Sequence, residues 1–99
     1  AAPMAERAHS LAPQSPEIAD TLAWILHQQG QHDRSLELLR DANRRAPDQA
    51  EIAYHLAAVL KAKGRLTEAR DVLKGALQSG QAFDEVTDAR ALLQSLEAR

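Results

Sequence analysis

The same kinds of residue recur in this chain at a step of 34 positions. Pro13 returns as Pro47, and Gly30 returns as Gly64. The apolar positions follow the same step, as the pairs Ile18 and Ile52, Ala19 and Ala53, Leu22 and Leu56, Ala23 and Ala57, Leu26 and Leu60, and Leu39 and Leu73 show. A period of 34 residues with helical punctuation is typical of stacked helix-turn-helix units, each of which buries its apolar face against the next.

The composition supports one helical domain of 99 residues. Hydrophobic residues make up 44% of the chain, but it holds only one Trp, one Tyr and one Phe. The commonest residues, among them Ala, Leu, Glu and Arg, are strong helix formers, and no alternating strand pattern is present. The core is therefore expected to consist mainly of Ala and Leu.

Charge and cysteine content exclude several classes of protein. A net charge of −2 and a pI near 6.1 argue against a nucleic-acid module, which needs a basic surface. The absence of cysteine excludes disulfides and thiolate metal sites. No apolar run is long enough for direct membrane insertion, and no signal peptide is visible. The compartment stays open between the cytoplasm and the periplasm.

Periodicity and breaks predict six helices, over Pro3–Leu11, Pro16–Gln29, His32–Arg45, Gln49–Lys63, Leu66–Gln78 and Asp84–Glu97. Ser15 is expected to cap the second helix, and Asp48 with Glu51 resembles a capping box at the start of the fourth. Gly30 and Gly64 are expected to end helices in the left-handed conformation. The period fails at Gln81, where a third proline would stand.

The spacing resembles that of the tetratricopeptide repeat family. Its pattern positions hold Ala19, Leu22, Ala23, Leu26, Ser35, Leu39, Ala42 and Pro47 in one unit, and Ala53, Leu56, Ala57, Leu60, Ala69, Leu73, Ala76 and Gln81 in the next. The resemblance implies an all-α, right-handed α-solenoid of antiparallel helix pairs with a C-terminal capping helix. The expected divisions are a half unit (1–15), two full units (16–49 and 50–83) and the capping helix (84–99).

A narrower similarity concerns the C-terminal part of the chain. Its Gly break followed by the segment ARALLQSL, residues 89–96, is similar to the C-termini of bacterial envelope repeat proteins linked to exopolysaccharide or protein export. The first residues read as the middle of a repeat. We therefore expect a C-terminal segment of a longer bacterial repeat protein.

The resemblance also implies a concave groove lined by the first helix of each unit. The candidate groove residues are Glu17, Asp20, Trp24, His27, Gln28, Glu51, Tyr54, His55 and Lys61. Trp24 and Tyr54 are candidate binding anchors, since aromatic residues dominate many interfaces. The alternative is that Trp24 packs against a neighbouring helix as core. Because acidic or neutral residues replace the Lys, Asn and Arg of the carboxylate-binding type of groove, a partner of basic or aromatic character is expected.

Neither a metal site nor catalysis is predicted. His27 and His32 lie on either side of Gly30 and are not expected to converge, and His55 belongs to the next unit. No HExxH motif and no carboxylate pair at ligand spacing accompanies them. Without cysteine or a nucleophile-elbow serine, no enzyme activity and no cofactor are expected.

Two functions remain open from the sequence. The first is a scaffold that binds a peptide or helix of a partner protein in the groove. The second is a structural segment that self-associates, for example as a homo-oligomer through the apolar N-terminal edge of the half unit, or that packs within a longer repeat protein.

Overall fold

The computed structural model of the chain describes residues 3–98, and all regular structure within that range is helical. The helices are α1 (Pro3–Leu11), α2 (Pro16–Gln28), α3 (His32–Arg45), α4 (Ala50–Ala62), α5 (Leu66–Gln78) and α6 (Val86–Glu97). The all-α prediction is confirmed. Predicted and observed bounds differ by at most two residues, the largest difference being the start of α6 at Val86 rather than Asp84.

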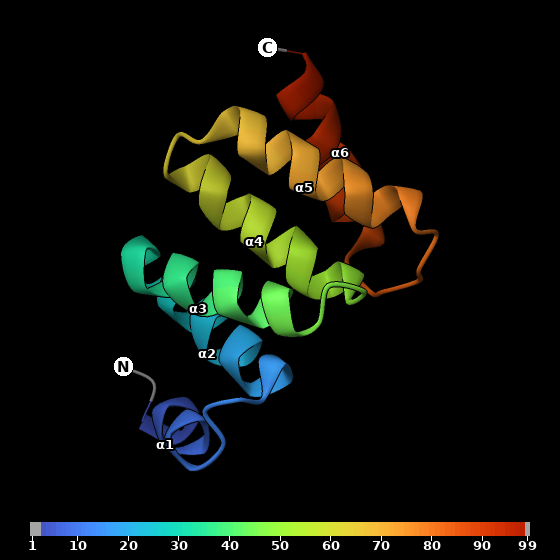
Figure 1. Cartoon of the computed structure of the whole chain (residues 1–99). Helices are drawn as coiled ribbons and strands as arrows, with labels where there is room; N and C mark the ends of the chain where they lie inside the picture. The colour runs from blue at the N-terminus through green and yellow to red at the C-terminus, as the bar shows by residue number, and fades with distance from the viewer. Residues whose placement is uncertain (1–2, 99) are drawn as a thin grey trace.

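The helices stack in pairs along the molecule (Figure 1). The α2–α3 and α4–α5 hairpins pack side by side through α3 and α4, and α1 packs on α2 at one end. The first helices of successive units also touch, since α2 contacts α4 and α4 contacts α6. None of the helices within residues 3–98 combines the length and the hydropathy of a membrane span.

Glycine ends α2 and α4 in the same way. Gly30 and Gly64 have φ values of 83° and 77°, which glycine adopts at little cost. Beyond each glycine the backbone N–H returns to the helix: that of Gln31 donates to the carbonyl of Leu26 at 2.8 Å, and that of Arg65 to Leu60 at 2.9 Å. This bonding satisfies carbonyls that a helix end leaves open, and it reverses the chain into the next helix.

The start of α2 follows the prediction, but the start of α4 does not. The Ser15 hydroxyl accepts a hydrogen bond from the N–H of Ile18 at 3.3 Å, so the predicted cap is confirmed. The predicted capping box of Asp48 and Glu51 is wrong, because Gln49 precedes α4 and makes no side-chain cap. The side chain of Gln81 instead accepts from the N–H of Ala50 at 2.6 Å, which ties the last loop to α4.

The core consists of leucine and alanine, as expected. Its largest fully buried side chains include Leu22, Leu26, Leu39, Leu60 and Leu73. The Ser35 hydroxyl, also fully buried, donates to the carbonyl of Ala23 at 2.7 Å and joins α3 to α2. At the end of the stack α6 buries Ala89 and Leu96 and packs on α5. Its role as a cap stays a prediction.

Candidate partner-binding site

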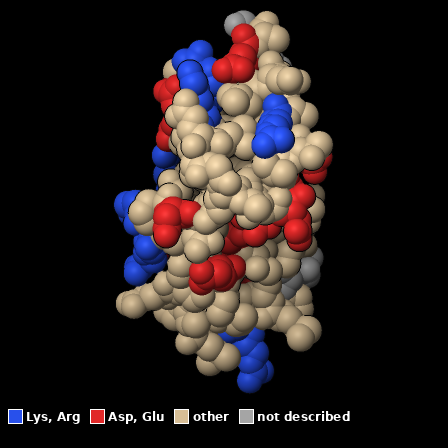
Figure 2. Space-filling model, turned by 90° about the vertical axis from the view of Figure 1, so that its right-hand side faces the viewer, with Lys and Arg blue, Asp and Glu red and all other residues tan. Residues whose placement is uncertain are grey.

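A pocket of about 320 Å³ opens between α2, α4 and the turn before α6. Its lining comprises Asp20, Thr21, Trp24, Ile25, Glu51, His55 and Glu85. Figure 2 shows the side on which the N-terminal ends of α2, α4 and α6 lie, and acidic side chains are prominent across its middle. Four of its lining residues, Asp20, Trp24, Glu51 and His55, are therefore among the candidate groove residues.

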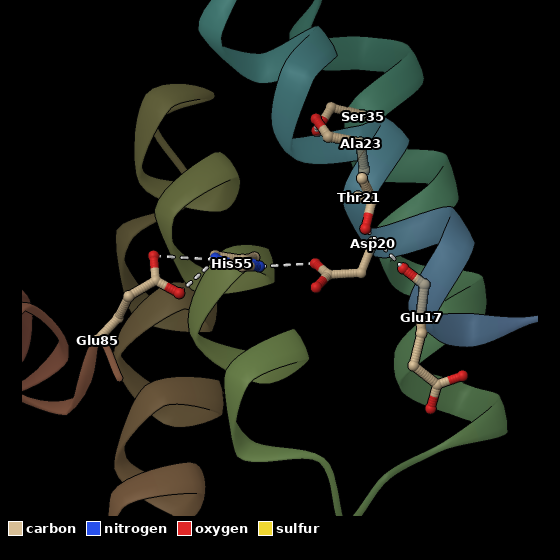
Figure 3. A network of polar contacts seen from close by, with 7 residues as sticks. All are labelled: Glu17, Asp20, Thr21, Ala23, Ser35, His55 and Glu85. Carbon is tan, nitrogen blue, oxygen red and sulfur yellow. Dashed lines mark hydrogen bonds and ion pairs between the residues drawn. The ribbon is translucent and has the colours of Figure 1, made fainter. Parts of the chain in front are cut away.

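His55 is one of the lining residues and joins three segments of the chain (Figure 3). Its Nδ1 is 2.7 Å from Oδ1 of Asp20 on α2. Its Nε2 is 3.0 Å and 3.2 Å from the two carboxylate oxygens of Glu85, the residue before α6. The imidazole is buried, at 5% exposure, so α2, α4 and the start of α6 are held together by an internal ionic contact.

The surroundings of His55 favour its charged form. Burial lowers the pKa of an imidazole, but the hydrogen bonds and charges of Asp20 and Glu85 outweigh it, and the pKa of His55 is raised above its ordinary value. Both ring nitrogens face carboxylate oxygens, which only accept hydrogen bonds. Both nitrogens can donate at once only in the imidazolium form.

Trp24 forms an aromatic wall of the pocket. Its ring stacks on that of His55 with centroids 4.0 Å apart and an interplanar angle of 27°. Trp24 is half-buried, so the structure combines the two alternatives: part of the indole packs on a neighbouring helix and part lines the pocket. Tyr54 was expected to lie open in the groove, and it is buried at 8% exposure between Trp24 and Phe83.

The carboxylates of Glu51 and Glu85 both lie near His55, contrary to the expectation that no carboxylate pair accompanies a histidine. One ligand atom each of Glu51, His55 and Glu85 lies within 4.8 Å of the others. Hydrogen bonding with the Glu85 side chain raises the pKa of the Glu51 carboxyl, and partial burial adds to the rise. These three residues have the atom types to hold a cation.

The expectation that His27 and His32 stay apart is also wrong. Their Nδ1 atoms lie 2.9 Å from each other, because the Gly30 turn folds α3 back along α2. Burial, followed by the nearby charges of His32 and His55, lowers the pKa of His27. His27 also contacts Trp24, with ring centroids 5.0 Å apart, so this pair lies next to one of the residues that line the pocket.

The structure brings only part of the predicted set together. Asp20, Trp24, Glu51 and His55 line the pocket, whereas five other candidate groove residues do not: Glu17, His27, Gln28, Tyr54 and Lys61. Glu85 was missed, although a signal existed, because Glu17, Glu51 and Glu85 follow one another at the repeat step of 34 residues. The failure of the period at Gln81 hid the third member of this series.

Comparison with protein families gives a match for most of the chain. The family model described as anaphase-promoting complex, cyclosome, subunit 3 matches residues 1–76, which is more than half of the chain. No curated protein matches the sequence. The matched residues include all of the first unit and most of the second. They therefore contain four of the residues that line the pocket, namely Asp20, Trp24, Glu51 and His55.

Proposed function

The chain belongs to the anaphase-promoting complex, cyclosome, subunit 3 family, a tetratricopeptide-type repeat family, and from this premise we propose a scaffold function. Under this proposal, the chain binds a peptide or helix of a partner protein in the groove beside α2, α4 and the start of α6. Repeat families of this type typically hold other proteins and are not enzymes. Their stacked units present extended concave surfaces for binding.

The observation that carries this proposal is the pocket with Trp24 in its wall. Binding energy at interfaces concentrates in a few residues, and tryptophan is prominent among them when a partner can cover it. Trp24 is held in place by its stack on the buried ring of His55, so it loses little freedom on binding. The acidic rim favours a protein partner over a nucleic acid, whose phosphates it would repel.

Selection of peptides from a random display library against the chain tests the proposal. Selected peptides should change the fluorescence of Trp24, which is the only tryptophan. Trp24→Ala should weaken their binding by more than about 1 kcal/mol. The matched control is Arg44→Ala, on the exposed surface of α3, which should leave binding unchanged. Peptides that bind equally well to Trp24→Ala would contradict the groove proposal.

Self-assembly is the second candidate, because α1 exposes large apolar side chains. Met4 and Leu11 are 85% and 77% exposed, and no other large hydrophobic residue among 3–98 is comparably open. Sedimentation of the wild-type chain and of a Met4→Ser, Leu11→Ser double variant tests this candidate. A wild-type oligomer that becomes a monomer in the variant supports it, whereas a wild-type monomer contradicts it. The envelope export role suggested by the C-terminal segment stays a prediction.

A further inference from the structure

Glu51, His55 and Glu85 bring three potential metal-ligand atoms together at the pocket. One such atom of each residue lies within 4.8 Å of the other two. The Nε2 atom of His55 is 3.0 Å and 3.2 Å from the two carboxylate oxygens of Glu85. Two ligand atoms of a tetrahedral zinc ion, each about 2 Å from the metal, stand about 3.4 Å apart. The imidazole and Glu85 are therefore already close to the spacing of a ligand pair.

Glu51 reaches the same point from the helix that carries His55. It lies four residues before His55 on α4, so the two side chains project from one face of the helix. The same i, i+4 spacing places two ligands of one helix on a metal ion in the HExxH motif. Glu51 is exposed, and rotation of its side chain can bring a carboxylate oxygen to ligand distance. Two ligands thus come from α4 and the third from the turn before α6.

Asp20 orients the ring of His55 for metal binding. Its Oδ1 is 2.7 Å from Nδ1 of His55, and both side chains are buried (Figure 3). A metal-ligating histidine almost always donates its other N–H to a carboxylate, a carbonyl or water, which fixes its tautomer and orientation. When Nδ1–H donates to Asp20, the lone pair of the neutral ring lies on Nε2, the nitrogen that faces Glu85. This buried support distinguishes the group from a cluster of exposed carboxylates.

A divalent ion would offset negative charge at the pocket. Among residues 3–98, the lining contains three carboxylates, of Asp20, Glu51 and Glu85, and neither Lys nor Arg. A metal ion binds the neutral imidazole, so it takes the place of the Nε2 proton and releases it. The exchange adds one unit of positive charge among the carboxylates, where partial exclusion of water strengthens the attraction.

From this arrangement we infer that the pocket is a binding site for one divalent transition-metal ion, with Glu51, Glu85 and Nε2 of His55 as its ligands. Asp20 is a positioning residue that acts through His55. Imidazole together with carboxylates suits zinc and its neighbours, whereas calcium and magnesium take oxygen ligands. Three protein ligands leave a fourth position of a tetrahedral ion for water or for a donor atom from outside the chain. The site is independent of the proposed groove function and of self-assembly.

Isothermal titration of the chelator-treated chain with zinc chloride tests the inference. Zinc should bind at one ion per chain, and calcium should bind at least about tenfold more weakly. Glu51→Gln and Glu85→Gln keep the side-chain shape but remove a charged ligand, so each should weaken zinc at least about tenfold. Glu17→Gln is the matched control, because Glu17 occupies the equivalent repeat position outside the pocket. Thermal unfolding by circular dichroism verifies that each variant is folded.

Spectroscopy identifies the atoms that bind. In NMR spectra of the histidine rings, zinc should replace the proton on Nε2 of His55, whereas Nδ1 should keep its proton. Asp20→Asn retains an acceptor for that proton without the charge, and it should weaken zinc about tenfold without changing which nitrogen binds. Cobalt(II) should quench the fluorescence of Trp24, the only tryptophan, because its ring stacks on that of His55.

The pair of His27 and His32 is the competing site, since their Nδ1 atoms lie 2.9 Å apart. His32→Gln should leave zinc binding unchanged, and loss of binding in this variant would overturn the inference. So would equal binding of zinc and calcium, which indicates only an acidic surface, or a chain that binds no zinc.

Variants of Glu51 and Glu85 that bind zinc like the Glu17 variant would overturn it as well. The scaffold proposal is tested separately, by peptide selection in the presence of chelator. Either proposal can therefore fail while the other stands.

Discussion

Carboxylates on the outer helices, α1, α3 and α5, and carboxylates in the inner pocket have opposite kinds of electrostatic surroundings. Along α1, α3 and α5, Glu6 pairs with Arg34 and Glu68 pairs with Arg40. In the pocket, Asp20 and Glu85 share a single histidine. The outer pairs are half-exposed and locally neutral, whereas the inner group is largely buried and locally negative.

The outer pairs show that the same contact can recur at equivalent repeat positions with its two residue types exchanged. Position 6 corresponds to position 40 at the repeat step of 34, and position 34 corresponds to position 68. The unit boundary between α1 and α3 therefore has Glu and Arg where the boundary between α3 and α5 has Arg and Glu. Exposed pairs of this kind contribute little stability. The buried inner group is more sensitive to change, because an unmatched charge cannot be solvated there.

The largest expected effect comes from the core that supports both surfaces. Leu39 and Leu73 are fully buried at equivalent repeat positions. Leu39→Ala and Leu73→Ala should each lower the free energy of unfolding by roughly 2–5 kcal/mol, measured by chemical denaturation. Leu11→Ala is the control, because Leu11 is 77% exposed and should change stability by less than about 0.5 kcal/mol. If the buried and the exposed sites lost equal free energy of unfolding, Leu39 and Leu73 would not belong to a core that supports both surfaces.

The next largest loss of stability is expected from the buried group of Asp20, His55 and Glu85. His55→Ala leaves the buried carboxylate of Asp20 without its partner, and it removes the ring on which Trp24 stacks. The loss should be about 3 kcal/mol, the lower end of the range for breaking a buried ion pair. His9→Ala, on α1, is the matched histidine control. If both variants unfold at the same denaturant concentration, His55 does not hold the three segments together.

The pH dependence of stability should have opposite signs at the two regions. The raised pKa of His55 means that its contribution is fully present below its ordinary value of 6.5 and is lost as pH rises through the folded-state pKa. The Arg40 hydrogen bond lowers the pKa of Glu68, so that contribution is present above 4.5 and is lost on acidification through the folded-state pKa.

Denaturation of His55→Gln and Glu68→Gln against wild type over a pH series measures both contributions. The stability difference for His55→Gln should shrink as pH rises above 6.5, and that for Glu68→Gln should shrink as pH falls below 4.5. If both stability differences shrank in the same direction of pH change, the pH dependence of the two regions would not have opposite signs.

The smallest effect concerns the half-exposed pair of Arg40 and Glu68. Either Arg40→Glu or Glu68→Arg alone should destabilise by up to about 1 kcal/mol, whereas the double exchange should recover most of the loss. The other unit boundary already has this exchanged order in Glu6 and Arg34. A double-mutant cycle of unfolding free energies gives the coupling. A coupling of zero would mean that the outer pairs contribute nothing to the stack.

Much of the fold could be predicted from local patterns. The bounds of α1, α3 and α5 agree with the prediction, and so do the Ser15 cap and the left-handed Gly30 and Gly64. These features depend on residues near one another in sequence, so periodicity and capping preferences reveal them. The predicted capping box at the start of α4 was wrong, because the N–H of Ala50 donates instead to the side-chain oxygen of Gln81, which lies 31 residues away.

The candidate site was predicted only in part. The repeat pattern placed Asp20, Trp24 and Glu51 in the groove, and all three line the pocket. It could not show that Tyr54 and His55 are buried, since their exposure depends on Trp24 and on the segment before α6. Glu85 continued the series of Glu17 and Glu51, but the altered residue at position 81 concealed it.

The sequence by itself determined the repeat, the helices and the apolar faces, because a 34-residue period and helix punctuation are properties of the chain read in order. Only the tertiary structure decided which charges meet. His55 draws one carboxylate from α2 and another from the residue before α6, 35 and 30 positions away. Packing of three first helices at close range, rather than any local motif, creates the buried ionic group, since the energy of a charge depends on its neighbours in space and on their exclusion of water.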